Sequence, residues 1–169
     1  MRRLLLLHAD VQDLRQALSA GRSPLVLTSR TKHLDDLAER LLGECSNIFI
    51  LKGGMGTRQR NKLAESIAAA PIDQPRVILA TGSYLGEGFD DVRLDTLFLA
   101  MPISWRGTLP QYVGRLHRLY QNKKEVHVYD YADVLVPMLA RMYKKRLAGY
   151  AALGHCVVGN ECNSSDTLS

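Results

Sequence analysis

Short aliphatic and β-branched runs alternate along this 169-residue chain with longer segments in which apolar residues recur every three or four positions. The short runs indicate buried strands, and the longer segments indicate helices with one apolar face. Strands are expected at 24–28, 47–51, 76–80, 96–100 and 125–130, and helices at 11–20, 34–42, 57–70, from 108 onward, and at 134–150. Strands that alternate with helices predict an α/β fold with a mostly parallel central sheet flanked by helices.

Glycine and polar residues mark where these elements begin and end. Gly21 and Gly43 stop the first two helices, and Thr57 can cap the third. Residues 108–111 have the pattern of a capping box at the start of the fourth helix. In the last helix we expect an apolar stripe to face the core and a basic stripe to face solvent. The first comprises Leu135, Leu139, Met142 and Leu147, and the second Arg141, Lys144, Lys145 and Arg146.

Length and composition are typical of one ordinary globular domain. Hydrophobic residues make up 46% of the chain and charged residues 23%. We therefore expect a single domain over residues 1–158 and a flexible polar tail at 159–169. The apolar run at 4–7 is too short for a secretion signal or a membrane span. A net charge of +5 favours an anionic partner, of which nucleic acid is the commonest.

The cysteines and histidines show no pattern typical of a metal site. The three cysteines are odd in number and lack C-x-x-C spacing, so neither a disulfide framework nor a zinc site is predicted, and a reducing cytoplasm is expected. Four histidines have no recognisable ligand spacing: His8, His33, His127 and His155. No metal ligand is assigned.

Residues 111–118, Gln-Tyr-Val-Gly-Arg-Leu-His-Arg, place two arginines and a glycine on the fourth predicted helix. Arg115 and Arg118 are three residues apart and so share nearly one helix face, with Gly114 leaving space beside them. Arginine stays charged and donates paired hydrogen bonds to phosphate oxygens, which suits a group that stabilises charge in phosphoryl transfer. The alternative is a solvated basic helix in which Gln111 only completes the cap and His117 faces solvent.

Three further segments precede this arginine block in order along the chain. Residues 25–30 end a strand in a polar turn, 52–60 hold three glycines followed by arginines, and 80–90 run from Thr81 to Gly88-Phe89-Asp90. Together the four segments resemble motif IV, the following strand exit, motif V and motif VI of superfamily 2 helicases. The resemblance spans about 23–130 and is to the C-terminal RecA-like lobe. It is nearer the restriction-enzyme motor-subunit type than the DEAD-box type, because motif V is one residue longer and Tyr112 replaces an arginine.

The resemblance implies a three-layer RecA-like, P-loop-NTPase-like fold and a role for each motif residue. Catalytic contacts to a triphosphate would come from Arg115, Arg118 and Gln111. The nucleotide would lie against Gly88, Asp90 and Gly114. Nucleic acid would be contacted by Thr28, Ser29, Arg30, Gly53, Gly54, Arg60 and Thr81.

Each of these roles has a plain structural alternative. The glycines at 53–56 would let helix amides approach a phosphate, or they form only a tight turn. Asp90 would accept a ribose hydroxyl, or it caps a helix or turn. Trp105 would stack on a base or seal a cleft between lobes, although a lone tryptophan is more often a packing residue.

Two elements of a complete motor are missing from the sequence. No G-x-x-x-x-G-K-[ST] loop is present, and the Asp35-Asp36 pair falls within a predicted helix rather than after a strand. ATP and magnesium are therefore expected to bind mainly to an N-terminal RecA-like lobe of a longer protein, and this chain alone should not hydrolyse ATP. The expected partners are that lobe and nucleic acid, with DNA favoured over RNA, and no membrane.

Two other functions compete with this interpretation. One is a stand-alone RecA-like module that binds nucleic acid or protein without ATPase activity. The other is a flavodoxin-like nucleotide or cofactor enzyme in which the glycines of 82–88 hold a small ligand. Tight nucleotide binding by the chain alone would favour the second of these.

Overall fold

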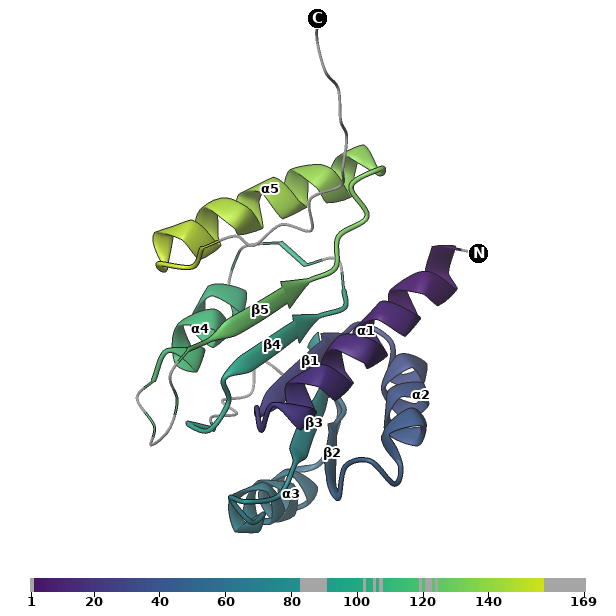
Figure 1. Cartoon of the computed structure of the whole chain (residues 1–169), viewed down its shortest axis with the longest axis vertical. Helices are drawn as coiled ribbons and strands as arrows, with labels where there is room; N and C mark the ends of the chain where they lie inside the picture. The colour runs from purple at the N-terminus through teal and green to yellow at the C-terminus, as the bar shows by residue number, and fades with distance from the viewer. Residues whose placement is uncertain are drawn as a thin grey trace, which may run out of the picture.

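The computed structural model describes residues 2–82, 91–101, 103–104, 106, 108–118, 120, 123 and 125–156, without the side chains of 2–10, 108 and 115. In this part of the chain, five strands form one parallel sheet in the order β2-β3-β1-β4-β5 (Figure 1). The strands are β1 (Pro24–Thr28), β2 (Asn47–Leu51), β3 (Arg76–Thr81), β4 (Thr96–Leu99) and β5 (His127–Asp130). The predicted α/β class with a parallel sheet is confirmed.

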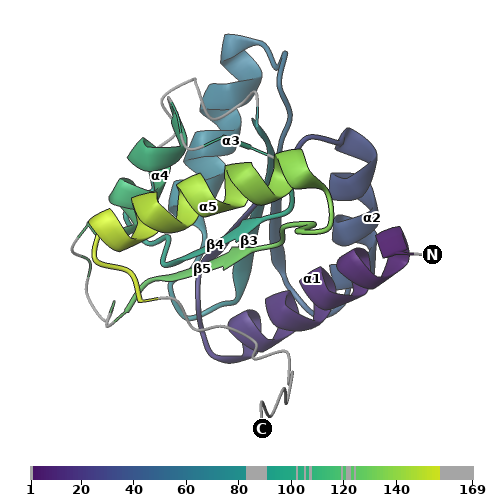
Figure 2. The same ribbon diagram turned by 90° about the horizontal axis from the view of Figure 1, so that it is seen from above.

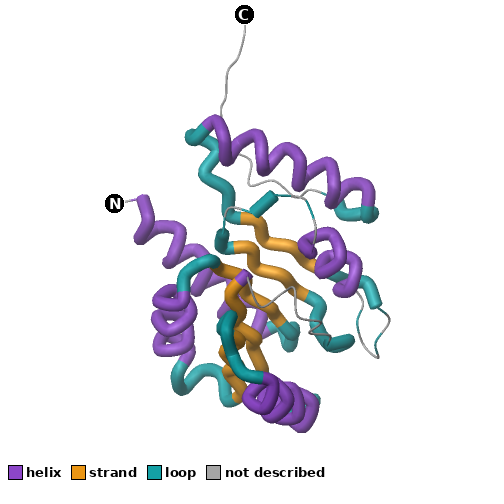
Figure 3. The backbone as a smooth tube through the Cα atoms, turned by 180° about the vertical axis from the view of Figure 1, so that it is seen from behind, coloured by secondary structure: helices purple, strands orange, loops and turns teal. Residues whose placement is uncertain are grey.

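Helices cover both faces of this sheet, so the fold has three layers (Figures 2 and 3). The helices are α1 (Arg2–Ser19), α2 (Thr31–Leu41), α3 (Thr57–Ala69), α4 (Thr108–Leu116) and α5 (Pro137–Ala152). One core cluster joins α1 and α2 to strand residues such as Val26 and Phe98. The other joins α3, α4 and α5 to residues such as Leu27 and Leu99 on the opposite sheet face. Successive residues of a strand point to opposite faces, which explains why these central strands are apolar throughout.

The start of the third helix was predicted correctly, but its cap was not. The helix α3 begins at Thr57, but its N-cap is Gly56 and no side chain caps its amide groups. Thr57 is the first helical residue, so its hydroxyl has no capping role in the helix that follows.

The last helix differs more from its prediction. It begins at Pro137 rather than at 134, which suits the fixed φ of proline at a first helical position. Leu135 lies before the helix and is 68% exposed, so it does not belong to an apolar stripe. Arg146 was predicted to face solvent, but it is only 2% exposed and its guanidinium pairs with Asp130. Position 146 is one turn from Tyr150, whose side chain is also buried, so the backbone turns Arg146 inward.

No described helix combines the length and the apolar character needed to cross a membrane.

Candidate functional site

Two predicted motif residues end adjacent strands at the same level of the sheet. Thr28 of β1 and Thr81 of β3 are register partners, and both side chains are buried. Because all the described strands are parallel, the loops after them gather at one edge of the sheet, where ligands of open α/β sheets bind. Predicted nucleic-acid residues from three separate segments therefore meet along this carboxyl edge.

The turn after β1 is organised by the Thr28 hydroxyl. The Thr28 Oγ1 atom accepts a hydrogen bond from the backbone N–H of Arg30 at 3.3 Å. It also lies 3.0 Å from Nδ1 of His33, a histidine to which no role was assigned from the sequence. Ser29 and Arg30 are exposed. The spacing Thr-x-x-x-x-His at a strand-to-helix junction is the only local signal that could have paired these two side chains.

Burial lowers the pKa of His33, with Arg30 and Arg40 acting in the same direction and Asp36 opposing them. As the pH falls through about 6.5, the ordinary pKa of histidine, His33 is therefore protonated in the unfolded chain before it is protonated in the folded chain. The free energy of unfolding should fall as the pH is lowered from about 7 to about 5, and His33→Gln should reduce that loss. Urea unfolding across this pH range measures both slopes. Equal slopes for the two proteins would contradict a lowered pKa for the half-buried His33.

The glycine turn after β2 is joined directly to the end of β3. The backbone N–H of Gly53 donates a hydrogen bond of 2.9 Å to Oγ1 of Thr81. Gly54 has a φ of +84°, a left-handed conformation that disfavours any side chain, so this glycine is required by the turn. The side chain of Lys52 pairs with Asp35 of α2 at 2.8 Å. Residues 28 positions apart, from two predicted motifs, thus form one rigid corner.

Two helices begin at this edge with their first amide groups free of side-chain caps. The N-caps of α2 and α3 are Arg30 and Gly56, neither of which makes a side-chain capping bond, and neither helix has an acidic residue in its first turn. Helix N-termini of this kind attract anions through their amide groups and the helix dipole. Arg58 is exposed and Arg60 partly exposed in the first turn of α3, which adds positive charge.

The helix α4 begins at Thr108, where the sequence predicts a helix start, and ends at Leu116. His117 and Arg118 lie beyond this end, so the prediction that Arg115 and Arg118 share one helix face is wrong: the helix ends before position 118. Its buried side chains recur at helical spacing: Leu109, Tyr112, Val113 and Leu116. Gln111 and Arg118 are exposed, and a Cβ added at Gly114 would meet no atom within 4 Å. Tyr112, which replaces an arginine of related motifs, is therefore a core residue.

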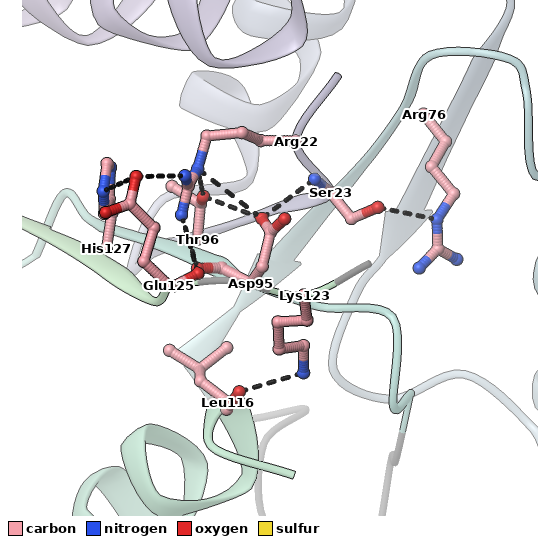
Figure 4. A network of polar contacts seen from close by, with 9 residues as sticks. All are labelled: Arg22, Ser23, Arg76, Asp95, Thr96, Leu116, Lys123, Glu125 and His127. Carbon is pink, nitrogen blue, oxygen red and sulfur yellow. Dashed lines mark hydrogen bonds and ion pairs between the residues drawn. The ribbon is translucent and has the colours of Figure 1, made fainter. Parts of the chain in front are cut away.

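The end of α4 lies near the opposite, amino edge of the sheet (Figure 4). Lys123 donates hydrogen bonds of 2.9 Å from Nζ to the carbonyl oxygens of Leu116 and Arg118. Burial lowers the pKa of Lys123, and Asp95 and Asp91, which precede β4, oppose this effect. The backbone of Arg118, which Lys123 holds, thus lies toward the edge of the sheet opposite to the Thr28 and Thr81 corner. Lys123 fixes the backbone of the arginine block, a role that local sequence does not reveal.

A buried polar network holds the start of the loop that precedes α4. The Arg146 guanidinium donates two hydrogen bonds to the Asp130 carboxylate, at 2.7 and 2.8 Å, and a third to the Ile103 carbonyl oxygen at 2.6 Å. The Tyr150 hydroxyl donates to the same carboxylate at 2.8 Å. Burial raises the pKa of Tyr150, and the Asp130 carboxylate raises it further. This network connects β5 and α5 to the loop that leads into the arginine block.

Several predicted residues lie outside the described part of the chain. These are Gly88 and Asp90 of motif V, Trp105, the side chain of Arg115 and the tail at 159–169. Their predicted roles stay predictions.

Solved structures with this arrangement of strands and helices include several helicase domains. The C-terminal part of the Fun30 ATPase domain is 23% identical, with a TM-score of 0.53 over 68% of this chain and 36% of that chain. The C-terminal domain of the DEAD-box protein Dbp5 is 17% identical, with a TM-score of 0.61 over 88% and 80%. Domain 2 of the DEAD-box helicase Mss116p, bound to an RNA duplex, is 14% identical, with a TM-score of 0.57 over 83% and 55%.

The chain shares its fold with the C-terminal domain of Dbp5 and with domain 2 of Mss116p. It spans about a third of the Fun30 chain that it matches and most of the Dbp5 domain. No family model and no curated protein matches its sequence. The predicted RecA-like, three-layer class is therefore confirmed at the level of the fold.

Proposed function

We propose that this chain is the C-terminal lobe of an ATP-dependent superfamily 2 nucleic-acid helicase or translocase. The observation that carries the proposal is the hydrogen bond between Gly53 and Thr81, which joins two predicted motifs at the carboxyl edge of the sheet. The helicase-lobe fold supports the same proposal.

The carboxyl edge is the proposed nucleic-acid track. The uncapped N-termini of α2 and α3 would receive backbone phosphates, with Arg30 and Arg60 supplying neutralising charge. Thr28 and Thr81 would act mainly by shaping the two turns, because both hydroxyls are buried in contacts to neighbouring loops. Such binding should weaken strongly as salt is raised, since it releases counterions.

The exposed face of α4, together with Arg118 just beyond its end, is the proposed nucleotide face. Gln111, Arg115 and Arg118 would reach across a cleft to the triphosphate of ATP, which a second, N-terminal lobe would hold together with magnesium. Gly114 and the segment with Gly88 and Asp90 would lie against the nucleotide. The space beside Gly114 fits this role, because a Cβ built there meets no atom of another described element within 4 Å. Closure of the lobes would couple hydrolysis to movement along a strand.

Reconstitution with a Walker-type lobe tests this proposal. Calorimetry with a non-hydrolysable ATP analogue should show weak or no binding to this chain alone, and joining the missing lobe should produce an ATPase that single-stranded DNA or RNA stimulates. DNA and RNA are assayed separately, with DNA expected to be preferred. Tight nucleotide binding by the chain alone would favour the small-ligand enzyme. Nucleic-acid binding without any ATPase in the joined protein would favour the stand-alone binding module.

A further inference from the structure

Two histidine side chains from distant parts of the chain meet beside the end of α4. The Nε2 atoms of His117 and His155 are 2.8 Å apart, and the ring planes are inclined by 69° with centroids 4.7 Å apart. His117 is exposed and His155 partly exposed. In this contact the Nε2–H of one ring is donated to the Nε2 atom of the other. Two nitrogen atoms that can bind a metal therefore converge at a place that solvent reaches.

The backbone on both sides of this pair is fixed by helix ends. After α5, Gly154 has a φ of +84°, its N–H bonds to the Ala151 carbonyl, and the N–H of His155 bonds to the Tyr150 carbonyl at 3.0 Å. This is the Schellman arrangement that ends a helix and reverses the chain. Lys123 holds the backbone on either side of His117. The two rings are therefore brought together by anchored segments, which favours binding to both at once.

We propose that His117 and His155 form a two-ligand site for a divalent transition-metal ion of the zinc class, with water in the remaining positions. Zinc binds imidazole nitrogen at about 2.0–2.1 Å, so two ligands in a tetrahedral arrangement lie about 3.3 Å apart. The observed 2.8 Å requires the rings to separate by about half an ångström, which an exposed ring such as His117 can do. On binding, the shared proton moves from Nε2 to Nδ1 of the donating ring, so both Nε2 lone pairs face the ion.

The chemistry of the pair selects among metal ions. Neutral imidazole suits zinc, copper and nickel, whereas magnesium and calcium require oxygen ligands. Within the described residues, no carboxylate contacts either ring. A bound ion would tie the arginine block to the end of α5, whatever reaction the complete protein performs.

Calorimetric titration of the chain with zinc chloride tests the site. A Cys156→Ser, Cys162→Ser background removes the two cysteines nearest the C-terminus, so that zinc-thiolate binding does not contribute. We expect saturable binding of one zinc ion per chain, no response to magnesium chloride, and affinity that falls by about 10-fold or more in His117→Gln and in His155→Gln. His127→Gln, which removes a histidine paired with Glu125 at the amino end of β5, is the matched control and should bind as the background does.

Circular dichroism of each variant establishes that the fold is retained before affinities are compared. Loss of zinc binding in His127→Gln, or equal binding in the background and in His155→Gln, would overturn the proposal. So would the absence of saturable binding in the background. None of these outcomes bears on the ATPase reconstitution, so the two proposals fail or succeed separately.

Discussion

Replacing Arg115 or Arg118 with alanine, in a two-lobe protein that contains this chain, should lower kcat of the nucleic-acid-stimulated ATPase by about 10³-fold or more. The expected loss is large because these guanidinium groups would stabilise charge that develops only during phosphoryl transfer. Binding of the ATP analogue should change much less than kcat. Steady-state ATPase assays with saturating nucleic acid give kcat and KM separately.

The matched control for this experiment is Arg141→Ala. Arg141 is an exposed arginine of α5 outside the predicted motifs, and its removal changes the net charge by the same amount. Its turnover should stay close to that of the unaltered protein. Unchanged turnover in both Arg115→Ala and Arg118→Ala would refute the proposed arginine fingers, whereas loss of nucleic-acid binding alone would reassign them to the track.

Replacing Arg146 with alanine should lower the free energy of unfolding by about 3–5 kcal/mol. Arg146 and Asp130 are 2% and 7% exposed at their side chains, so the change leaves a buried carboxylate without its cationic partner, although the Tyr150 hydroxyl still donates to it. The Ile103 carbonyl also loses its donor. Urea unfolding followed by circular dichroism measures the difference.

Two further variants separate the charge of Arg146 from its bulk. Arg146→Met keeps much of the side-chain volume and should still be strongly destabilising, whereas Arg146→Met combined with Asp130→Asn should recover part of the loss. Arg15→Ala breaks an ion pair with Glu44 in which both side chains are over 40% exposed, and it should cost far less. A double variant no more stable than Arg146→Met would show that the ion pair is not the cause.

The strands were predicted more accurately than the ends of the last helix. Continuous apolar runs such as Leu25–Leu27 can be buried on both faces only in a central parallel strand, so their pattern identifies them locally. In α5, by contrast, Val134, Leu135 and Val136 continue an apolar pattern into a segment that is exposed and not helical. Arg146 was also wrongly predicted to face solvent, because it is charged. Its burial depends on the carboxylate of Asp130, which lies 16 positions earlier in the chain.

At the candidate site, too, local sequence predicted some features and missed others. The motif order along the chain predicted a common role for Thr28, Gly53 and Thr81, and their turns lie at one edge of the sheet. The role itself stays a prediction. The roles of His33 and Lys123 were missed, since each depends on which hydroxyl or carbonyl lies next to it after folding. Hydrogen-bond partners of this kind leave no periodic signal in the sequence.

The spacing of apolar residues, with glycine and polar residues at the ends of elements, is sufficient to predict the order of helices and strands. A helix between most successive strands then favours a parallel sheet. They do not specify the strand order β2-β3-β1-β4-β5, which places β1 between β3 and β4. That order decides which distant groups meet: Gly53 with Thr81, Arg146 with Asp130, and His117 with His155. Each pair depends on a few ångströms of tertiary placement, because hydrogen bonds and buried charges lose their energy when the partners are slightly apart.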